Sequence, residues 1–268
     1  MEKKRLDNLL IERGLFETKS KAQAAIMAGD VKINGEKITK AGFQIKDTED
    51  LNIEIQTMPY VSRGGFKLEK AIKSFNIDFS NKICLDAGAS TGGFTDCLLQ
   101  NGASKVYAVD VGYGQIAWKL REDPRVKVIE KTNIKNCQPE DIYDNTDEKA
   151  EFAVMDLSFI SITKVLPNIK KMLSKQQMVA LIKPQFEAGR EQIGKNGVVT
   201  DKKVHIEVIK SVISYAKTIN LFPKNLTYSS IKGPAGNIEY LIYLTDEPNS
   251  LDDDKIQSVA DEAFEILN

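Results

Sequence analysis

The spacing of apolar residues divides the chain into two regions with different patterns. In the first region, apolar residues that recur on one side predict helices over residues 5–13 and 20–28. The dipeptide Asn34-Gly35 stands between two short apolar segments and indicates a hairpin, because both residue types tolerate a positive φ. A further strand is expected over residues 51–55. We therefore predict a small α+β domain over residues 1–58.

In the second region, apolar segments alternate with amphipathic ones. The first is a helix in which Leu68, Ala71, Ile72 and Phe75 share one face. Strands are predicted over 83–85, 106–109, 126–129, 152–155, 178–182 and 238–244, and helices over 93–100, 162–173 and 204–219. Such alternation is typical of right-handed crossovers and a mostly parallel sheet with helices on both faces. We expect an α/β domain over residues 66–268 and a linker over residues 59–65.

Charge is distributed unevenly between these regions. Residues 1–46 contain ten basic and six acidic residues, a net charge of +4 in a chain whose total is −1, so the remainder carries −5. A basic head on an acidic body indicates a docking module for a polyanion. We expect a monomer.

Other side chains exclude several classes of protein. The three cysteines have no metal-ligand spacing, and His205 is the only histidine, so a disulfide framework, a metal site and a His-centred triad are not expected. No apolar run approaches the roughly 20 residues that span a bilayer, and the N-terminus lacks a secretion signal. We expect a cytoplasmic protein that binds no metal and no membrane.

A glycine-rich loop, Asp86-Ala-Gly88-Ala-Ser-Thr-Gly92-Gly93-Phe94, directly follows the first strand of the second region and opens a helix. Glycines let the backbone approach a ligand, and the first amides of a helix are free to donate hydrogen bonds. Ligands of such sheets bind beyond the carboxyl ends of the strands. Asp110 ends the next strand, where its carboxylate can accept hydrogen bonds from a ribose. The loop therefore predicts a cofactor that contains a nucleoside.

Two other interpretations of this loop are a plain tight turn and a nicotinamide dinucleotide site. The glycines do not follow the G-x-G-x-x-G spacing of the dinucleotide site. An aspartate two residues before the first glycine is instead typical of methyltransferases, which favours S-adenosylmethionine. The residues expected to bind this cofactor are Asp86, Gly88, Ser90, Thr91, Gly92, Gly93, Phe94, Asp110, Val111, Asn133 and Asp156.

Four charged residues are expected to meet at the same edge of the sheet. Asp156 and Lys183 each follow a buried strand. Glu239 stands near the start of a late strand, which reaches that edge if it runs antiparallel. Lys67 lies on the first helix but points away from its apolar face. Each residue alone has an ordinary explanation as a surface or capping side chain, whereas the four together beside a methyl donor predict a catalytic group.

The chemistry of methyl transfer suits these side chains. An acceptor hydroxyl is a weak acid, so it needs a base or a cation that stabilises the developing negative charge. A lysine next to a second lysine loses its proton more easily, and neighbouring acids oppose that loss. The sequence alone leaves open which of these effects is larger.

Several stretches resemble the TlyA family of ribosomal RNA 2′-O-methyltransferases, some of which are labelled haemolysins. They are Ser62-Arg-Gly-Gly-Phe-Lys-Leu68, Asp156-Leu-Ser-Phe-Ile-Ser161 and Lys183-Pro-Gln-Phe-Glu187. Residues 5–7, 14–15 and 20–35 together resemble an RNA-binding module first seen in a ribosomal protein of the small subunit. The resemblance covers essentially the whole chain and implies a Rossmann-like methyltransferase domain of the FtsJ type with an antiparallel last strand.

The resemblance also implies roles for individual residues. Lys67, Asp156, Lys183 and Glu239 correspond to the catalytic tetrad of the family, and S-adenosylmethionine would lie against Gly88 and Asp110. The substrate would be the ribose of a cytidine in ribosomal RNA. The binding partner would be rRNA or a ribosomal subunit. We expect RNA contacts from Lys4, Arg5, Arg13, Lys19, Lys21, Lys32 and Arg63.

Two other functions remain open at this point. One is a non-catalytic RNA-binding or ribosome-assembly protein, in which the second domain would bind no methyl donor. The other is a pore-forming haemolysin, but the sequence has no amphipathic or apolar segment of suitable length.

Overall fold

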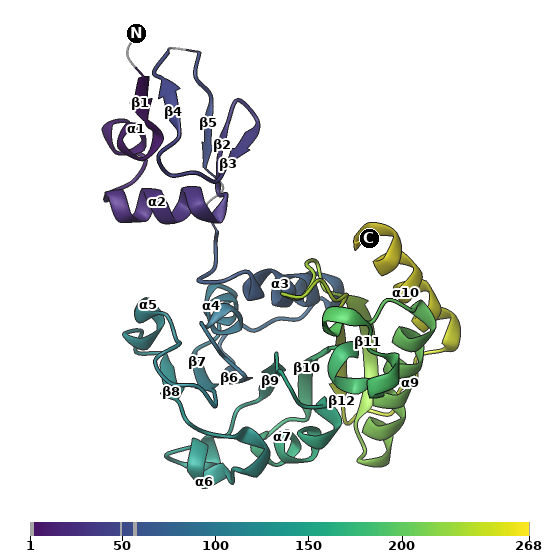
Figure 1. Cartoon of the computed structure of the whole chain (residues 1–268). Coiled ribbons are helices and arrows are strands. Elements are labelled where there is room, and N and C mark those ends of the chain that lie inside the picture. Colours follow the sequence, from purple (N-terminus) through teal and green to yellow (C-terminus); the bar gives the residue numbers. More distant parts are fainter. Residues whose placement is uncertain (1–2, 49, 56–57, 268) are drawn as a thin grey trace. The chain divides into compact units, whose positions relative to one another are not determined.

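The computed structural model describes residues 3–48, 50–55 and 58–267. The chain forms two compact units, Met1–Pro59 and Tyr60–Asn268, and each is described here by itself. Figure 1 gives the order of helices and strands in both.

The first unit packs two helices against short strands. Helices α1 (Leu6–Glu12) and α2 (Lys19–Ala28) precede a three-stranded antiparallel sheet of β2 (Val31–Ile33), β3 (Glu36–Ile38) and β5 (Ile53–Ile55). The hairpin predicted at Asn34-Gly35 is present, with both residues at positive φ. A second pair, β1 (Lys3–Arg5) and β4 (Gln44–Lys46), was not predicted. The core of this unit consists of Leu6, Leu9, Leu10, Ala22, Ile26, Val31, Ile33 and Leu51.

The second unit is built on a seven-stranded sheet with the order β11-β12-β10-β9-β6-β7-β8. Its strands are β6 (Ile83–Ala87), β7 (Lys105–Val109), β8 (Val126–Ile129), β9 (Phe152–Met155), β10 (Gln177–Ile182), β11 (Phe222–Tyr228) and β12 (Tyr240–Thr245). Neighbours from β8 to β10 are parallel, whereas β12 runs antiparallel to both β10 and β11. The predicted α/β sheet with an antiparallel last strand is confirmed.

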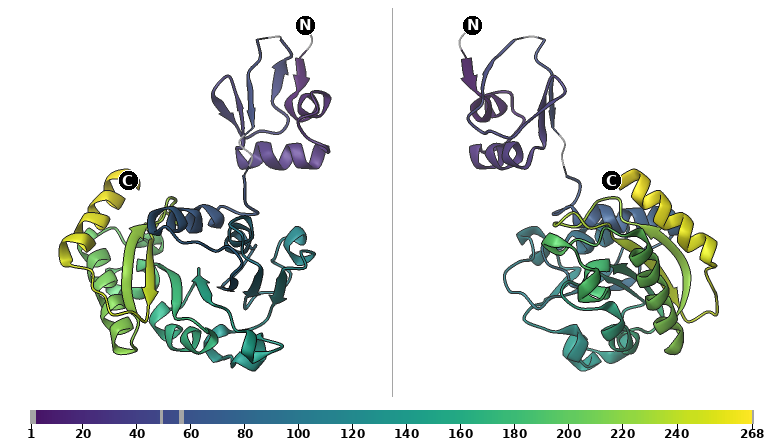
Figure 2. Two further views of the ribbon diagram at one scale, coloured as in Figure 1. Left: turned by 180° about the vertical axis from the view of Figure 1, so that it is seen from behind. Right: turned by 45° about the vertical axis from the view of Figure 1, so that its right-hand side comes forward.

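Helices cover both faces of this sheet (Figure 2). One face packs against α3 (Gly64–Phe75) and α4 (Gly93–Gln100). The other packs against α6 (Pro139–Ile142), α7 (Leu166–Met172), α9 (Lys202–Thr218) and α10 (Asp253–Leu267). Two four-residue helices, α5 (Trp118–Arg121) and α8 (Pro184–Glu187), lie in connections. Successive strand residues alternate between the two cores, as Cys84 and Leu85 do.

Three features differ from the sequence-based expectations. The helix expected over 162–173 begins as a separate 3₁₀ turn, Ile162–Lys164, before α7, in which Pro167 occupies the first turn because proline lacks an N–H. Strand β11 and helix α10 were not predicted. Residues 64 and 65 of the expected linker form the start of α3, and Tyr60 is buried with its ring 5.6 Å from that of Phe66.

Candidate active site

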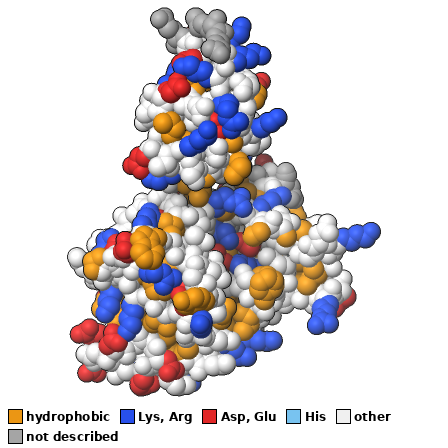
Figure 3. Space-filling model, turned by 60° about the vertical axis from the view of Figure 1, so that its left-hand side comes forward, with side chains coloured by type: hydrophobic (Ala, Val, Ile, Leu, Met, Phe, Trp, Pro, Cys, Tyr) orange, Lys and Arg blue, Asp and Glu red, His pale blue; other side chains and the backbone are white. Residues whose placement is uncertain are grey.

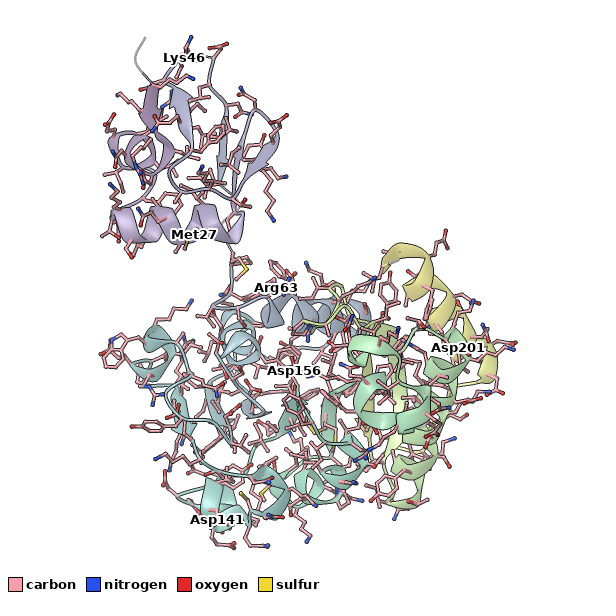
Figure 4. All side chains as sticks on the ribbon, in the orientation of Figure 1. Met27, Lys46, Arg63, Asp141, Asp156 and Asp201 are labelled. Carbon is pink, nitrogen blue, oxygen red and sulfur yellow. The ribbon has the colours of Figure 1, made fainter. Side chains whose placement is uncertain are left out.

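The carboxyl ends of the central strands bring the four charged residues together. Asp156 follows β9 and Lys183 follows β10, which are parallel neighbours. Glu239 precedes β12, whose first residue pairs with the last residue of β10, so the antiparallel direction carries Glu239 to the same edge. Lys67 reaches this point from the first turns of α3. Figure 4 labels Asp156 at this edge.

The four side chains form a continuous chain of ion pairs. Lys183 Nζ lies 2.6 Å from Asp156 Oδ1, and Lys67 Nζ lies 3.3 Å from Asp156 Oδ2. Lys67 Nζ also donates to Glu239 Oε2 at 2.8 Å. The carboxylate of Asp156 is therefore held between two ammonium groups, and only one of these groups also contacts the second acid.

Burial and charge act against each other in this cluster. Burial would raise the pKa of Asp156, but the charges of Lys183 and Lys67 lower it below its usual value. Burial would lower the pKa of Lys67, but the carboxylates of Asp156 and Glu239 raise it. Lys67 is therefore held as an ammonium ion, which means that for this lysine the neighbouring acids have the larger effect.

Lys67 and Glu239 are less accessible than the sequence indicated. Lys67 does not point to solvent: its side chain is 6% exposed, because it lies one turn before Ala71 and shares the buried side of α3. Glu239 is 1% exposed and lies behind Lys67, outside the lining of the adjacent cavities. Both residues can orient Asp156, but of the two only Lys67 faces a cavity.

Two cavities meet at Asp156. The first, which we call the lysine cavity, has a volume of about 320 Å³ and is bounded by Lys67, Lys183, Arg63 and the start of α4. The second, the Asp110 cavity, has a volume of about 480 Å³ and is bounded by Asp110, Asn133 and the loop after β9. Gly88, Ser90, Asp156 and Ser158 line both. Figure 3 shows basic and acidic side chains gathered in a recess of this unit.

The glycine-rich loop forms the wall shared by these cavities. Gly88 has a φ of +88°, and a Cβ there would lie 2.8 Å from the carbonyl oxygen of Asp156, so only glycine permits this close approach. The carboxylate of Asp110 accepts hydrogen bonds from the backbone amides of Ser90, at 2.8 Å, and Gly112, at 2.7 Å. These bonds fix Asp110 beside the loop.

Most residues expected to bind the cofactor line one of the two cavities. They are Gly88, Ser90, Thr91, Gly93, Phe94, Asp110, Val111, Asn133 and Asp156. Gly92 instead packs against Leu120, and Asp86 is fully buried, with its Oδ2 accepting from Thr95 Oγ1 at 2.6 Å. The structure therefore does not bring Asp86 and Gly92 to the cavities. Burial raises the pKa of Asp86 to about 7.

Sequence reasoning did not single out several side chains of this site. Ser158 Oγ accepts from Lys183 Nζ at 2.9 Å, and Gln185 donates to Glu239. Phe159 is 91% exposed at the Asp110 cavity and has a φ of +64°, which is rare outside glycine. Ser158 could have been found as a polar residue two positions after Asp156, in the same loop.

Glu187 was also missed as an individual residue. Its carboxylate accepts from Ser161 Oγ at 2.6 Å and from the amide of Ile162 at 2.8 Å. These bonds join α8 to the loop that follows β9. Nothing local in the sequence indicates this long-range contact.

Known protein families match both units. The FtsJ-like methyltransferase family matches residues 60–245, and the S4 domain matches residues 4–51. The chain belongs to the FtsJ-like methyltransferase family.

Individual relatives place this FtsJ-like methyltransferase among the TlyA proteins. It is 42% identical over 242 residues to the 16S/23S rRNA (cytidine-2'-O)-methyltransferase TlyA of Mycobacterium tuberculosis, over 90% of this chain and 89% of that protein. It is 48% identical to YqxC, a candidate rRNA methyltransferase of Bacillus subtilis, over 99% of this chain and 96% of that protein.

A solved structure of a hemolysin-like protein from Streptococcus thermophilus has the same fold. It superimposes with a TM-score of 0.77 at 44% identity, covering 99% of this chain and 97% of that one. The resemblance inferred from the sequence motifs is confirmed.

The S4 domain holds six of the seven residues expected to contact RNA. Four of them form ion pairs within the domain: Lys4 with Glu12 at 2.6 Å, Arg5 with Asp7 at 2.7 Å, Arg13 with Asp47 at 2.5 Å, and Lys21 with Glu17. Lys19 and Lys32 form no ion pair with the described residues. Arg63 is exposed in the methyltransferase unit at the start of α3, where Figure 4 labels it, and lines the lysine cavity.

The described residues of this FtsJ-like methyltransferase contain neither a candidate metal site nor a candidate membrane span. No group of three or more His, Cys, Asp or Glu side chains is placed to hold a metal ion. No helix among residues 3–48, 50–55 and 58–267 combines the length and apolarity needed to span a bilayer.

Proposed function

We propose that this chain transfers the methyl group of S-adenosylmethionine to a ribose 2′-hydroxyl of ribosomal RNA, with a cytidine as the target. The observation that carries the proposal is the position of Asp156, between two lysines and at the junction of two cavities. The TlyA relatives named as rRNA (cytidine-2'-O)-methyltransferases support the choice of substrate. Such a substrate would place the enzyme in the cytoplasm.

The residues of the Asp110 cavity suit the nucleoside part of the cofactor. Asp110 would accept hydrogen bonds from its ribose, Asn133 would lie near its base, and Val111 would supply apolar contact. Gly88 lets the glycine-rich loop lie close to the Asp156 backbone, so both cavities border the same two residues. The bound cofactor supplies an electrophilic methyl group, already activated by its sulfonium.

The lysine cavity would hold the acceptor hydroxyl. Its oxygen would form the new bond to the methyl carbon, and the electron pair of the broken carbon–sulfur bond would stay on sulfur. Lys183 Nζ would first release one ammonium proton to solvent and then take up the hydroxyl proton, and Asp156, whose Oδ1 lies 2.6 Å from Nζ, would pair with the ammonium that forms again. Ser158, which accepts from Lys183 Nζ, orients the same nitrogen.

Lys67 and Glu239 are positioning residues in this scheme. Lys67 is held in its charged form and fixes one oxygen of Asp156, while Glu239 fixes Lys67 from behind. Asp156 thereby presents its other oxygen to Lys183. In this arrangement Lys183 accepts the proton, and Lys67 orients Asp156.

The S4 domain would dock the enzyme on structured RNA. We propose the first unit, Met1–Pro59, as the docking module and the second, Tyr60–Asn268, as the methyltransferase domain. Among the six expected RNA contacts of the module, Lys19 and Lys32 are the two that form no ion pair with a described acid. Arg63 at the lysine cavity would contact the phosphodiester of the substrate strand.

The test is methyl transfer from labelled S-adenosylmethionine to ribosomal subunits that lack the modification. We expect label on a ribose 2′ oxygen of a cytidine, located by mapping 2′-O-methyl marks, and loss of transfer in Lys183→Ala. Absence of any affinity for S-adenosylmethionine, or an unchanged transfer rate in a folded Lys183→Ala protein, would contradict the proposal.

A further inference from the structure

Exposed hydrophobic side chains of the second unit concentrate near the Asp110 cavity. Val111, Tyr113, Trp118 and Phe159 are 68%, 72%, 69% and 91% exposed, and Ile266 on α10 is the remaining large one among the described residues of the second unit. Val111 and Phe159 line the cavity itself, whereas Tyr113 and Trp118 line neither cavity. Aromatic side chains are rarely left this open to solvent, and clusters of them mark interaction surfaces.

Tyr113 is held in place by the backbone on either side of it. The amide of Gly112 donates to Asp110 Oδ1 at 2.7 Å, and the amide of Gly114 donates to Glu130 Oε1 at 2.8 Å. Lys131 Nζ lies 4.3 Å from the centre of the Tyr113 ring. The ring is therefore fixed next to the cofactor-side cavity, with a cation against it.

Trp118 is held outward by the residues around it. Ile116 and Leu120 are buried at 5% and 2% exposure, and the amide of Ala117 donates to the carbonyl oxygen of Thr91 in the glycine-rich loop at 3.1 Å. The tryptophan thus stands on a rigid support but contributes little to the core. Its exposed position is not explained by folding.

The loop that carries Tyr113 and the helix that carries Trp118 are linked through Glu130. Glu130 accepts hydrogen bonds from the amide of Gly114 and from the guanidinium of Arg121, the latter at 2.6 Å, so it joins the Tyr113 loop to α5. The side chain of Lys119, next to Trp118, is 58% exposed and forms an ion pair with Asp96 at 2.9 Å. The surface therefore combines two flat rings with nearby cations, the composition that suits single-stranded nucleic acid. Figure 3 shows hydrophobic side chains on the face that carries the recess.

We propose that Tyr113 and Trp118 form a stacking surface for unpaired nucleotides that neighbour the methylated one. The inference rests on the proposed function, because a strand whose 2′-hydroxyl enters the lysine cavity must continue across the surrounding surface. Unpaired bases expose their flat faces, which stack on aromatic rings without regard to sequence, and Lys131 beside the Tyr113 ring attracts the phosphates. The substrate class is thus RNA that is single-stranded around its target.

The chain offers a direct probe, because Trp118 is its only tryptophan. In the full-length Lys183→Ala protein, which binds without turnover, we expect a short single-stranded RNA to quench the Trp118 fluorescence and to protect it from acrylamide. Duplex RNA of the same sequence should produce little quenching, since its bases are already stacked. Equal quenching by both forms would contradict the proposal.

Substitutions test the energetic contribution. Tyr113→Ala and Trp118→Ala should each weaken binding of the single-stranded RNA by about tenfold, the lower range for one stacked base, and Tyr113→Phe should restore binding. Affinity for S-adenosylmethionine should not change. The control is Ile266→Ala, which removes an equally exposed hydrophobic residue from α10 and should leave RNA binding unchanged.

Two outcomes would overturn the inference, and a third would separate it from the proposed function. A loss of S-adenosylmethionine affinity in Tyr113→Ala, with unchanged RNA affinity, would assign the residue to the cofactor. Weaker binding to intact subunits but normal binding to protein-free rRNA would indicate a ribosomal protein as the partner. If the wild-type protein binds RNA with quenching but transfers no methyl group, the proposed function fails while the stacking surface stands.

Discussion

Lys67 and Lys183 are buried to the same extent, at 6% exposure each, but have different partners. Lys67 neutralises both Asp156 and Glu239, whereas Lys183 contacts Asp156 alone among the acids. Lys67→Ala would leave Glu239 as a buried unpaired charge, which costs roughly 3 kcal/mol. Lys183→Ala leaves Asp156 paired with Lys67, so we expect a smaller loss in the free energy of unfolding.

Chemical denaturation and methyl-transfer assays on the same proteins separate these effects. Lys183→Ala should lose less stability than Lys67→Ala but lose about 100-fold or more in transfer rate. Lys73→Ala, which removes an exposed lysine of α3, serves as the control and should change neither quantity. Equal destabilisation by Lys67→Ala and Lys183→Ala would disprove the assignment of roles.

Asp86 predicts a pH dependence of stability. Its pKa is about 7 in the folded chain because of burial, against 3.8 for an ordinary aspartate. The folded state therefore holds a proton that the unfolded state has released, and this contribution to stability is lost as the pH rises from about 4 to about 7. Asp86→Asn cannot titrate, so its melting temperature should rise relative to wild type over that range.

Thermal unfolding of both proteins without cofactor, at several pH values, measures this difference. Groups common to both proteins cancel in the comparison, which isolates residue 86. A difference in melting temperature that does not vary with pH would mean that Asp86 is ionised throughout, despite its burial.

At the scale of elements, one carboxylate joins two loops of the site. Glu187 in α8 binds Ser161 and the amide of Ile162, and so fixes the segment that presents Ser158 and Phe159. Glu187→Ala should weaken S-adenosylmethionine binding and methyl transfer by about tenfold, the usual loss for a hydrogen bond to a charged group. Isothermal titration with the cofactor and single-turnover transfer would measure both.

Ser161→Ala provides the matched comparison. It removes only one of the two bonds, because Ile162 still donates to Glu187, so its effect should be clearly smaller. If the two variants behave alike, the hydroxyl and not the carboxylate holds the loop.

The elements that sequence reasoning predicted are those with strong apolar periodicity. The buried parallel strands and α3, α4 and α9 have such patterns, and they fix the sheet edge at which Asp156 and Lys183 lie. Strand β1 consists of three basic residues, and β4, Gln-Ile-Lys, is too short to establish a pattern. Strand β11 contains Pro223 and an irregular register, so none of the three shows sustained alternation. Helix α10 does have buried residues at helical spacing, but the many acidic residues between them made the apolar pattern hard to recognise in the sequence.

The candidate site was predictable to the extent that strand ends determine it. Asp156 and Lys183 follow from their positions after β9 and β10. The burial of Lys67 depends on how α3 packs, and the contact between Glu187 and residue 162 depends on two loops meeting, which no local pattern encodes. Asp86 illustrates the converse, because its place in the motif suggested a ligand contact while its strand position buries it.

At the scale of the whole molecule, we expect the S4 domain to provide affinity for RNA and the other unit to carry out methyl transfer. The S4 domain carries the basic excess, and its Lys19 and Lys32 are not neutralised by described acids. Lys19→Glu with Lys32→Glu should weaken binding to ribosomal RNA and make it less sensitive to salt, because each lost phosphate contact reduces the slope of log affinity against log salt by about one. Affinity for S-adenosylmethionine should stay the same, since its residues lie in the other unit.

A change in net charge alone must be separated from the loss of a docking site. Lys255→Glu, paired with a second reversal at Lys217, changes the total charge equally on helices α10 and α9 of the methyltransferase unit. This control should leave the salt dependence of RNA binding unchanged. If both pairs of substitutions weaken RNA binding alike, long-range charge and not the S4 surface governs association. A selective loss in the S4 variant, with methyl transfer recovered at high RNA concentration, is the result expected for a docking module that acts before the chemical step.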